Sequence, residues 1–233
     1  MQIGRNLAFG ALLVLASGMA YAAEQTILGS TFLVKNPSTP DRRKVLGKAK
    51  EPASTNTLVG NPVALGGTLV LSASGGSPSS QAFILPQGTS MTGKPFWSGD
   101  TTKGFKYKDA KGQNGPVKTV KIRRSAGGTF SIKAVAVGKL GTVLVTPPNP
   151  GTGACVQLQL QGGDTYVVEF GPTSRLTNKD GTLFKAKKPS VEGNCVAPTT
   201  TTVVTTTTTS TTATTLYSSP SRAFVDRILG LVD

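Results

Sequence analysis

Histidine is absent from this 233-residue sequence, and its absence removes several kinds of catalytic site. A chain without imidazole has no histidine general base, no Ser-His or Cys-His pair, and no histidine ligand for a metal. The sequence also contains no G-x-S-x-G, S-x-x-K, P-loop or G-x-G-x-x-G motif. We therefore expect a protein that is not an enzyme and that has no catalytic residue, cofactor or metal site.

Acidic residues are scarce as well. The 11 Asp and Glu residues stand against 25 Lys and Arg, which gives a formal net charge of +14. Asp100 and Asp109 flank a strand-like run, and two such carboxylates are what a glycosidase needs, so a hydrolase is one hypothesis. Each is equally well explained as a turn residue, because Asp100 follows Gly99 and Asp109 ends the run. The charge excess favours an anionic partner.

Cysteine is limited to Cys155 and Cys195. A single pair in an exported chain predicts a disulfide, which would close a loop of about 40 residues and contribute on the order of 4 kcal/mol in the chain-entropy model. The alternative is a pair of free, reactive thiols, but the sequence has no C-x-x-C pattern to support it.

Long apolar runs are absent except near the start of the chain. Arg5 precedes the apolar segment Leu7–Leu15, which is too short to span a bilayer, and Ala20-Tyr21-Ala22 forms an A-x-A cleavage motif. This pattern predicts a signal peptide over residues 1–22 and a mature chain that begins at Ala23; a membrane anchor is the alternative. We expect a secreted protein (extracellular, cell-surface or periplasmic) without a transmembrane span in the mature chain.

Short runs of alternating or β-branched residues, separated by Gly- and Pro-rich turns, recur from residue 23 to residue 197. About ten strands and no helix predict an all-β fold, an antiparallel β-sandwich of Ig-like or jelly-roll type whose strand order is open. Besides those in the central stretch described below, the expected strands are Thr26–Lys35, Arg42–Lys50, one starting at Leu69–Leu71, Ala82–Leu85, Thr142–Thr146, Cys155–Gln161, Asp164–Phe170 and Leu183–Lys187.

Beyond this domain the composition changes. Residues 198–216 include the run Thr199–Thr215, which is almost entirely threonine and predicts a disordered linker, either an exported stalk that carries O-linked glycans or a plain flexible tail. In residues 217–233, Ser219 and Pro220 can start a helix with Phe224 and Ile228 on one face. We expect a short amphipathic C-terminal helix of open function.

The central stretch is Pro95–Val137, which contains the only Trp. Alternation around Phe105–Asp109, in Val117–Arg124 and in Thr129–Val137 predicts a three-stranded antiparallel meander, with a hairpin at Ser125–Gly128. Lysines and arginines occupy the parity opposite the apolar residues, so the meander has a basic outer face. From Ala134 onward both parities are apolar, which predicts a strand covered on both faces.

The basic outer face is the candidate binding site, and its partner is expected to be an anionic polysaccharide or cell-surface polymer. The alternative is a solvated strand face, since charged edges and faces also prevent aggregation. The candidate residues are Lys103, Lys106, Lys108, Lys111, Lys118, Lys121, Arg123 and Arg124. A second basic cluster, Arg42, Arg43, Lys44, Lys48 and Lys50, belongs to the same site only if it lies on the same face.

A carbohydrate-binding module is the main alternative function. It would use Phe96, Trp97, Phe105 and Tyr107 as stacking platforms, with Trp97 and Tyr107 as the leading residues, and it requires Trp97 to be exposed. If these rings are buried, they are core residues. Sequence-specific nucleic-acid binding is not expected, although charge alone permits nonspecific binding. The sequence leaves the oligomeric state open.

The run from Gly104 to Arg124, GFKYKDAKGQNGPVKTVKIRR, and the following TFSIKAVAV resemble a block in uncharacterised secreted proteins of Gram-negative bacteria. Those proteins share the layout of a signal peptide, one β domain and a Thr-rich tract. The resemblance covers roughly residues 26–196. It implies export and a β fold, and it implies no activity and no functional residues.

Overall fold

The computed structural model describes residues 22–189 and Cys195. The predicted signal peptide up to Tyr21, the Thr-rich tract and the C-terminal helix lie outside the described residues. The described chain forms thirteen strands in two sheets, with one short α-helix and two 3-10 turns. The predicted all-β sandwich is confirmed. With thirteen strands, it has more strands than an immunoglobulin domain or an eight-stranded jelly roll.

The smaller sheet has the order β1-β11-β10-β4-β5 and is antiparallel except for the β1–β11 pair. Its strands are β1 (Glu24–Thr26), β4 (Gly67–Gly75), β5 (Ser79–Leu85), β10 (Gly151–Leu160) and β11 (Thr165–Phe170).

The larger sheet has the order β12-β13-β2-β3-β9-β8-β7-β6 and is antiparallel throughout. Its strands are β2 (Gly29–Lys35), β3 (Lys44–Glu51), β6 (Trp97–Asp100), β7 (Gly104–Lys108), β8 (Val117–Arg124), β9 (Phe130–Val137), β12 (Arg175–Lys179) and β13 (Leu183–Lys187).

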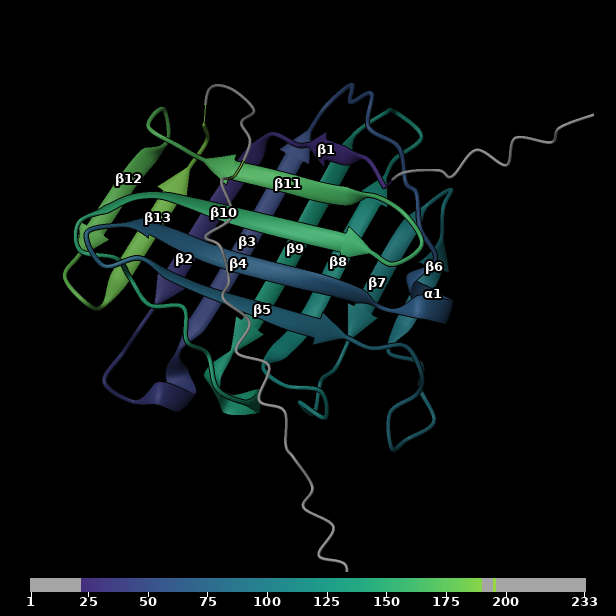
Figure 1. The fold of residues 1–233 in the computed structure, drawn as a ribbon, viewed down its shortest axis with the longest axis horizontal. Helices are drawn as coiled ribbons and strands as arrows, with labels where there is room; N and C mark the ends of the chain where they lie inside the picture. The colour runs from purple at the N-terminus through teal and green to yellow at the C-terminus, as the bar shows by residue number, and fades with distance from the viewer. Residues whose placement is uncertain (1–21, 190–194, 196–233) are drawn as a thin grey trace, which may run out of the picture. The chain divides into compact units, whose positions relative to one another are not determined.

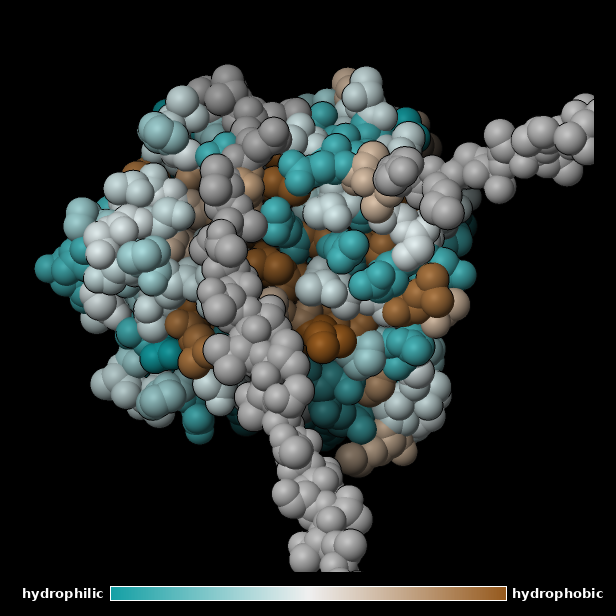
Figure 2. Space-filling model, in the orientation of Figure 1, coloured by the Kyte–Doolittle hydropathy of each residue, from teal (hydrophilic) through white to brown (hydrophobic). Residues whose placement is uncertain are grey.

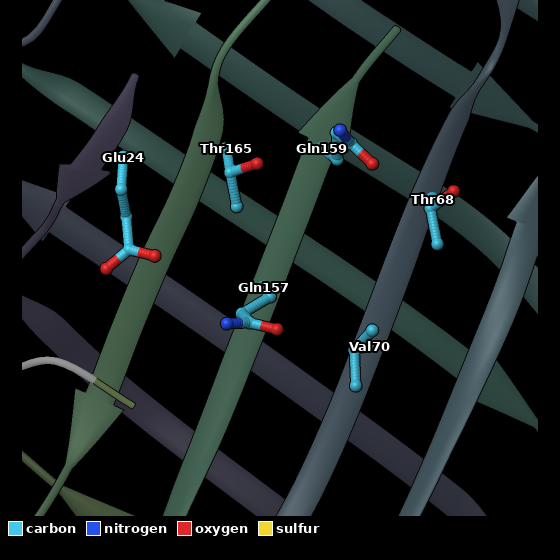
Figure 3. Close-up of a pocket in the computed structure, with 6 residues that line it drawn as sticks. All are labelled: Glu24, Thr68, Val70, Gln157, Gln159 and Thr165. Atoms are coloured by element: carbon cyan, nitrogen blue, oxygen red, sulfur yellow. The ribbon is translucent and has the colours of Figure 1, made fainter. Parts of the chain in front are cut away.

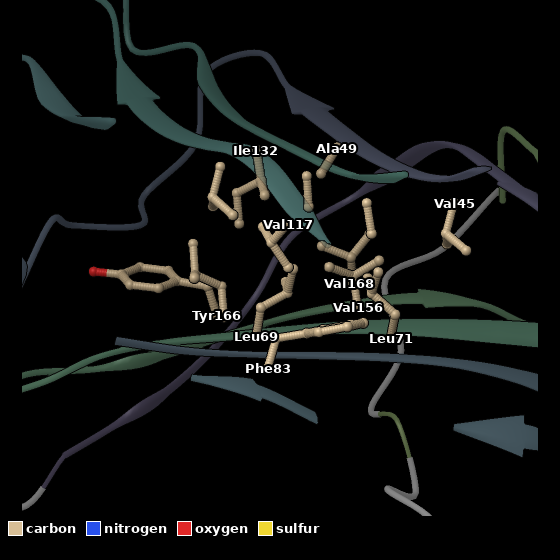
Figure 4. Packing of buried hydrophobic residues seen from close by; sticks show 14 of the residues in the cluster. Val45, Ala49, Leu69, Leu71, Phe83, Val117, Ile132, Val156, Tyr166 and Val168 are labelled. Carbon is tan, nitrogen blue, oxygen red and sulfur yellow. The ribbon is translucent and has the colours of Figure 1, made fainter. Parts of the chain in front are cut away.

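The two sheets pack face to face, and their strands cross at a steep angle (Figure 1). Most strands place alternate apolar residues in the interface, as the period of two requires. Aromatic side chains from both sheets meet there: the ring centroids of Phe130 and Tyr166 are 5.6 Å apart, and those of Phe32 and Phe170 are 5.9 Å apart. Figure 4 shows valine, leucine and isoleucine side chains from both sheets filling the space between them.

The sheets lie close together where β3 crosses β10. A Cβ atom added at Gly47 would lie 2.6 Å from a Val156 methyl group, a separation that real Cβ atoms do not adopt. The absence of a side chain at Gly47 therefore lets Val156 from the opposite sheet sit directly against β3. Interiors packed to crystal-like density tolerate little added volume at such a point.

Several sequence predictions are confirmed by the strand pairing. Strands β7, β8 and β9 form the expected antiparallel meander, with residues Ser125–Gly128 as the hairpin turn between β8 and β9. Gly128 has φ +74, the left-handed conformation for which glycine is suited. The two cysteines form the predicted disulfide, with Cα atoms 5.7 Å apart.

Other predictions are wrong. The single strand expected at Thr26–Lys35 is divided, because the chain changes sheets after Thr26: β1 pairs with β11 and β2 pairs with β3. The expected absence of a helix is also wrong, since Asn61 caps a one-turn helix, α1 (Pro62–Leu65), by accepting a hydrogen bond from Ala64 N. Strands β6 and β12 were not predicted.

The strand expected at Thr142–Thr146 is absent. This segment is instead held beside the edge strand β5 by side chains: Gln81 bonds Leu144 N and Thr142 O, and Ser79 bonds the backbone of Thr146. Gln81 and Ser79 thus replace the backbone ladder that would have defined a strand. The alternation in the segment is real, because Val143 and Val145 are buried, but alternation alone does not specify a hydrogen-bonding partner.

Candidate basic surface

A line of basic residues crosses the outer face of the eight-stranded sheet. The register pairs Lys106 of β7 with Lys121 of β8, Lys121 with Lys133 of β9, and Lys133 with Lys48 of β3. Neighbouring strands lie about 4.8 Å apart, so these four side chains leave the sheet side by side at that spacing. They come from segments far apart in the sequence, and only the strand order brings them into one line.

The same line extends to both edges of the sheet. At one edge, Lys106 pairs with Ser98 of β6. Toward the other edge, Lys48 pairs with Thr31 of β2, and Thr31 pairs in turn with Lys187 of β13. Lys187 then pairs with Arg175 of the edge strand β12. We call this line the basic row; it comprises Ser98, Lys106, Lys121, Lys133, Lys48, Thr31, Lys187 and Arg175. Across eight strands it spans about 34 Å.

Further cations flank the basic row on the same face. Lys50 and Arg123 lie on one side of it, and Lys44, Lys108 and Lys185 lie on the other. Among the outward-facing strand residues of the eight-stranded sheet, all of which the structure describes, Asp100 is the one carboxylate. Its Oδ1 accepts hydrogen bonds from the backbone of Thr102 and Lys103, so it holds its own turn.

The lysines of the basic row repel one another. Like charges directly opposite each other on neighbouring strands are unfavourable. Desolvation, followed by the positive charges of Lys106, Arg123 and Lys133, lowers the pKa of Lys121. A hydrogen bond and the charge of Lys187 likewise lower the pKa of Lys185. The backbone pairing holds these charges close together, and their repulsion lowers the stability of the folded protein.

A narrow apolar strip lies beside the basic row. Leu33, Leu46 and Val135 are consecutive partners across β2, β3 and β9, and Val135 is only 7% exposed. The sequence predicted that β9 is covered on both faces from Ala134 onward, and the burial of Val135 confirms this at that position. On this outer face its cross-strand neighbours are Leu46 and Thr119, and lysine stems commonly shield apolar surface beside them.

A surface hollow of about 670 Å³ lies at the β6 end of the basic row. Four cations line it, namely Lys103, Lys106, Arg123 and Arg124, and Ser98, Ser125, Thr129 and Ser131 add hydroxyl groups. Asp100 also borders it, but its carboxylate accepts hydrogen bonds from its own turn. The cations outnumber this carboxylate, so the hollow can bind a sulfate, phosphate or carboxylate group. Four of the predicted binding residues are therefore brought together in one place.

Some of the remaining predicted basic residues lie on the outer face of the eight-stranded sheet, and the others lie in loops and turns outside it. Lys118 is exposed at a bulge of β8, and Lys111 is exposed in the loop after β7. In the second cluster, Lys44, Lys48 and Lys50 share the outer face with the meander, so the two clusters form one surface. Arg42 lies in a 3-10 turn outside the sheet, and the Arg43 side chain is held by Asn36 and the carbonyl of Val143.

The aromatic residues are not on this surface. Phe96, Phe105, Tyr107 and Trp97 are 6%, 4%, 1% and 1% exposed, and they face the sheet interface. Trp97 Nε1 donates to Leu85 O at 3.0 Å, and burial raises the pKa of Tyr107 to about 12. The hypothesis that Trp97 and Tyr107 bind glycans by stacking is therefore wrong, because burial leaves their rings no face for a sugar.

Asp100 and Asp109 do not form a catalytic pair. Asp100 lies opposite Gly104, at the start of β7, whereas Asp109 follows the end of that strand. Five residues of extended chain separate their positions by roughly 16 Å, beyond the usual spacing of glycosidase carboxylates. Asp109 is buried and accepts a hydrogen bond from Asn114 N, as a turn residue does. In the described residues no cluster of three His, Cys, Asp or Glu could hold a metal.

The outer face of the five-stranded sheet has a different character. Figure 2 shows hydrophilic and hydrophobic residues intermingled over it. A shallow hollow of about 310 Å³ on this face is lined by Glu24, Thr68, Val70, Gln157, Gln159 and Thr165 (Figure 3). The outward residues of these strands are amides, hydroxyls and apolar groups that include the exposed Ile84, with Glu24 and Glu169 as carboxylates and no lysine or arginine.

Sequence reasoning missed part of the basic row, namely Lys133, Lys187 and Arg175. The sequence could have identified Lys133 and Lys187, because both alternate with apolar residues that are buried in their strands. Arg175 had no such signal, since its strand is exposed throughout.

The chain was compared with known proteins by sequence and by structure. No protein-family model matches it, and neither a curated protein nor a solved structure gives a match. Within the described residues, no helix has the length and apolar character needed to cross a membrane. The function is therefore inferred from the surface itself.

Proposed function

We propose that the protein is an exported, non-enzymatic binding or structural protein of the cell envelope or extracellular space, and that it binds linear anionic polymers such as acidic polysaccharides. The observation that supports this proposal is the basic row. Six of its eight positions are lysine or arginine, one to a strand, and the other two carry hydroxyl groups.

The spacing of the row favours a linear polymer that lies across the strands. Backbone hydrogen bonds fix successive positions about 4.8 Å apart, so a chain with one anionic group about every 5 Å meets one position per group. The hollow at the β6 end then receives the last group of the bound segment or a branch. Because the sheet already holds the charges in place, little ordering accompanies binding apart from that of lysine side chains.

The mutual repulsion of the row is a second reason to favour this function. Like charges in direct register lower the stability of the free protein, and an anionic ligand relieves that repulsion. A solvated face that served only to prevent aggregation would not need its lysines in one line, since scattered charges are sufficient for that purpose.

The test is binding of the processed chain to neutral and anionic polysaccharides over a salt series. We expect binding to the anionic polymers alone, with affinity that falls steeply as salt rises, because several charge contacts are screened together. Salt-insensitive binding, or equal binding to a neutral glycan, would contradict the proposal. Absence of binding to every anionic polymer at low salt would leave a structural role.

A further inference from the structure

The N-terminal strand is attached to the fold through a buried carboxylate. Asp164 lies at the start of β11 and is 6% exposed. Its Oδ1 accepts a hydrogen bond from Ala23 N at 2.9 Å, and its Oδ2 accepts one from Gln25 Nε2. In the described part of the chain no lysine or arginine pairs with this carboxylate. A buried carboxylate held only by neutral donors is unfavourable, since a cation would normally compensate it.

Ala23 is also the residue at which the A-x-A motif places the start of the mature chain. In the structure Ala22 and Ala23 are both exposed, and β1 begins at the next residue, Glu24. The first rung of the β1–β11 ladder joins Thr165 N to Ala23 O at 2.9 Å. The sequence motif and the position of Asp164 thus point independently to the same backbone nitrogen.

We propose that cleavage of the Ala22–Ala23 bond creates the cation that Asp164 lacks. A signal peptidase adds water across this peptide bond, so that Ala22 leaves with a carboxylate and Ala23 gains an α-amino group. At neutral pH that group is an ammonium, and the nitrogen that donated as an amide now donates as a charged group to the same carboxylate. Charge-assisted hydrogen bonds of this kind are about twice as strong as neutral ones.

The surroundings are suited to an ammonium group. Ala22 and Asp164 border a hollow of about 310 Å³ with Val59, Gln159, Gln161, Gly162 and Gly163, so removal of Ala22 opens the new terminus to water. The titratable groups on β1 and β11 are Glu24, Tyr166 and, toward the far end of β11, Glu169. Burial, followed by a smaller effect of the Asp164 charge, keeps Tyr166 neutral by raising its pKa to about 12. The loop at Val59 and the end of β10 bring no charge.

The pH dependence follows from the ammonium. Its ordinary pKa is about 7.7–8.0, and the neighbouring carboxylate raises it in the folded protein. The stabilisation is therefore complete below about pH 7.7 and is lost as the pH rises through the higher pKa of the folded state. A chain that begins at Ala22 has an amide at this position, and its own ammonium lies one residue farther from the Asp164 carboxylate, so its dependence on pH is much weaker.

The experiment compares two full chains, one beginning at Ala23 and one at Ala22. Both are released from exported fusions by a protease that leaves no added residue, so the disulfide forms in both. At pH 6.5 we expect the Ala23 chain to melt about 3 °C higher, and the gap to close by about pH 10. Asp164→Asn, which keeps an acceptor oxygen, should abolish the gap, whereas Glu24→Gln should leave it unchanged.

Two results would overturn the proposal. One is an intact mass for the naturally exported protein that corresponds to a start other than Ala23. The other is an equal melting temperature for the two chains at pH 6.5. If Asp164→Asn does not fold, acetylation of the Ala23 amine provides the alternative test, because it removes the charge and keeps the hydrogen-bond donor; the acetylated chain should then melt with the Ala22 chain.

Discussion

The two outer faces of the sandwich are built from the same kind of strand and differ almost entirely in charge. On the eight-stranded sheet, cations stand in register across neighbouring strands with one carboxylate among the outward positions, whereas on the five-stranded sheet glutamine and threonine occupy the equivalent positions and no cation is present. The cations of the strands are therefore displayed on one side. The net charge of a protein determines how strongly it attracts counter-ions, whereas the distribution of the charged residues determines where a charged polymer can bind.

The faces also differ in what stabilises them. The five-stranded face carries the disulfide, since Cys155 points outward from β10 and joins Cys195 there. The eight-stranded face has no covalent link among the described residues and carries repelling charges. The disulfide on one face thus stabilises the fold, whereas the repelling charges on the other face destabilise it. Surfaces suited to binding often lower the stability of a protein in this way.

The largest expected effect concerns the disulfide. Replacing both Cys155 and Cys195 by serine should lower the free energy of unfolding by about 4 kcal/mol, because the loop they close is about 40 residues long. Denaturant unfolding measures this loss. Polymer affinity at a temperature where the variant is folded should not change, since the basic row lies on the other sheet. A matching loss of affinity would show that the two faces are not independent.

The next effect concerns the basic row. The double change Lys121→Glu and Lys133→Glu places two carboxylates in its middle and should weaken binding of an anionic polysaccharide by about 100-fold at low salt. The control is Lys94→Glu with Lys139→Glu, which alters the net charge equally outside the strands and should change affinity only a few-fold. Equal losses in both variants would indicate attraction by total charge without a defined row.

The smallest effect is a gain in stability. Lys121→Met removes repulsion from Lys106 and Lys133 and should raise the free energy of unfolding by about 0.5 kcal/mol. Gln157→Met, at the matched central position of the other face, should change it by less. Because the pKa of Lys121 is lowered in the fold, its deprotonation relieves the repulsion as the pH rises toward 10.5, so the stability difference between Lys121→Met and the parent protein should shrink over that range. Urea unfolding at several pH values checks both expectations.

The sequence predicted what depends on local pattern. Alternation located the meander and placed Lys106, Lys121 and Arg123 on the outward parity, and the Gly-rich turn at Ser125–Gly128 defined a hairpin. It did not predict that Lys48 lies beside Lys133. That contact depends on the β3–β9 pairing, which joins segments about 85 residues apart and carries no local signal. The basic row is therefore a product of topology.

Burial of the aromatic residues was the other point that the sequence left open. Trp97 follows Pro95-Phe96 and precedes Ser98-Gly99, a setting as compatible with an exposed loop as with a core. Its burial is decided by Gly67 of the opposite sheet, where a Cβ would lie 3.2 Å from the indole ring, and by Leu85 O, which accepts its N–H. Neither partner is near Trp97 in the sequence, so the choice between binding platform and core required the fold.

Gly47 shows how closely surface and interior are linked in this fold. The residue that follows it in β3 is Lys48, whose side chain points into solvent, while the empty side-chain position of Gly47 receives a valine methyl from the other sheet. Any side chain at Gly47 would wedge the sheets apart directly beneath the middle of the charged surface. The alignment of the lysines on the outer face therefore depends on a buried position that a bound polymer would not contact. A substitution at Gly47 should weaken the proposed polymer binding although it changes no surface residue.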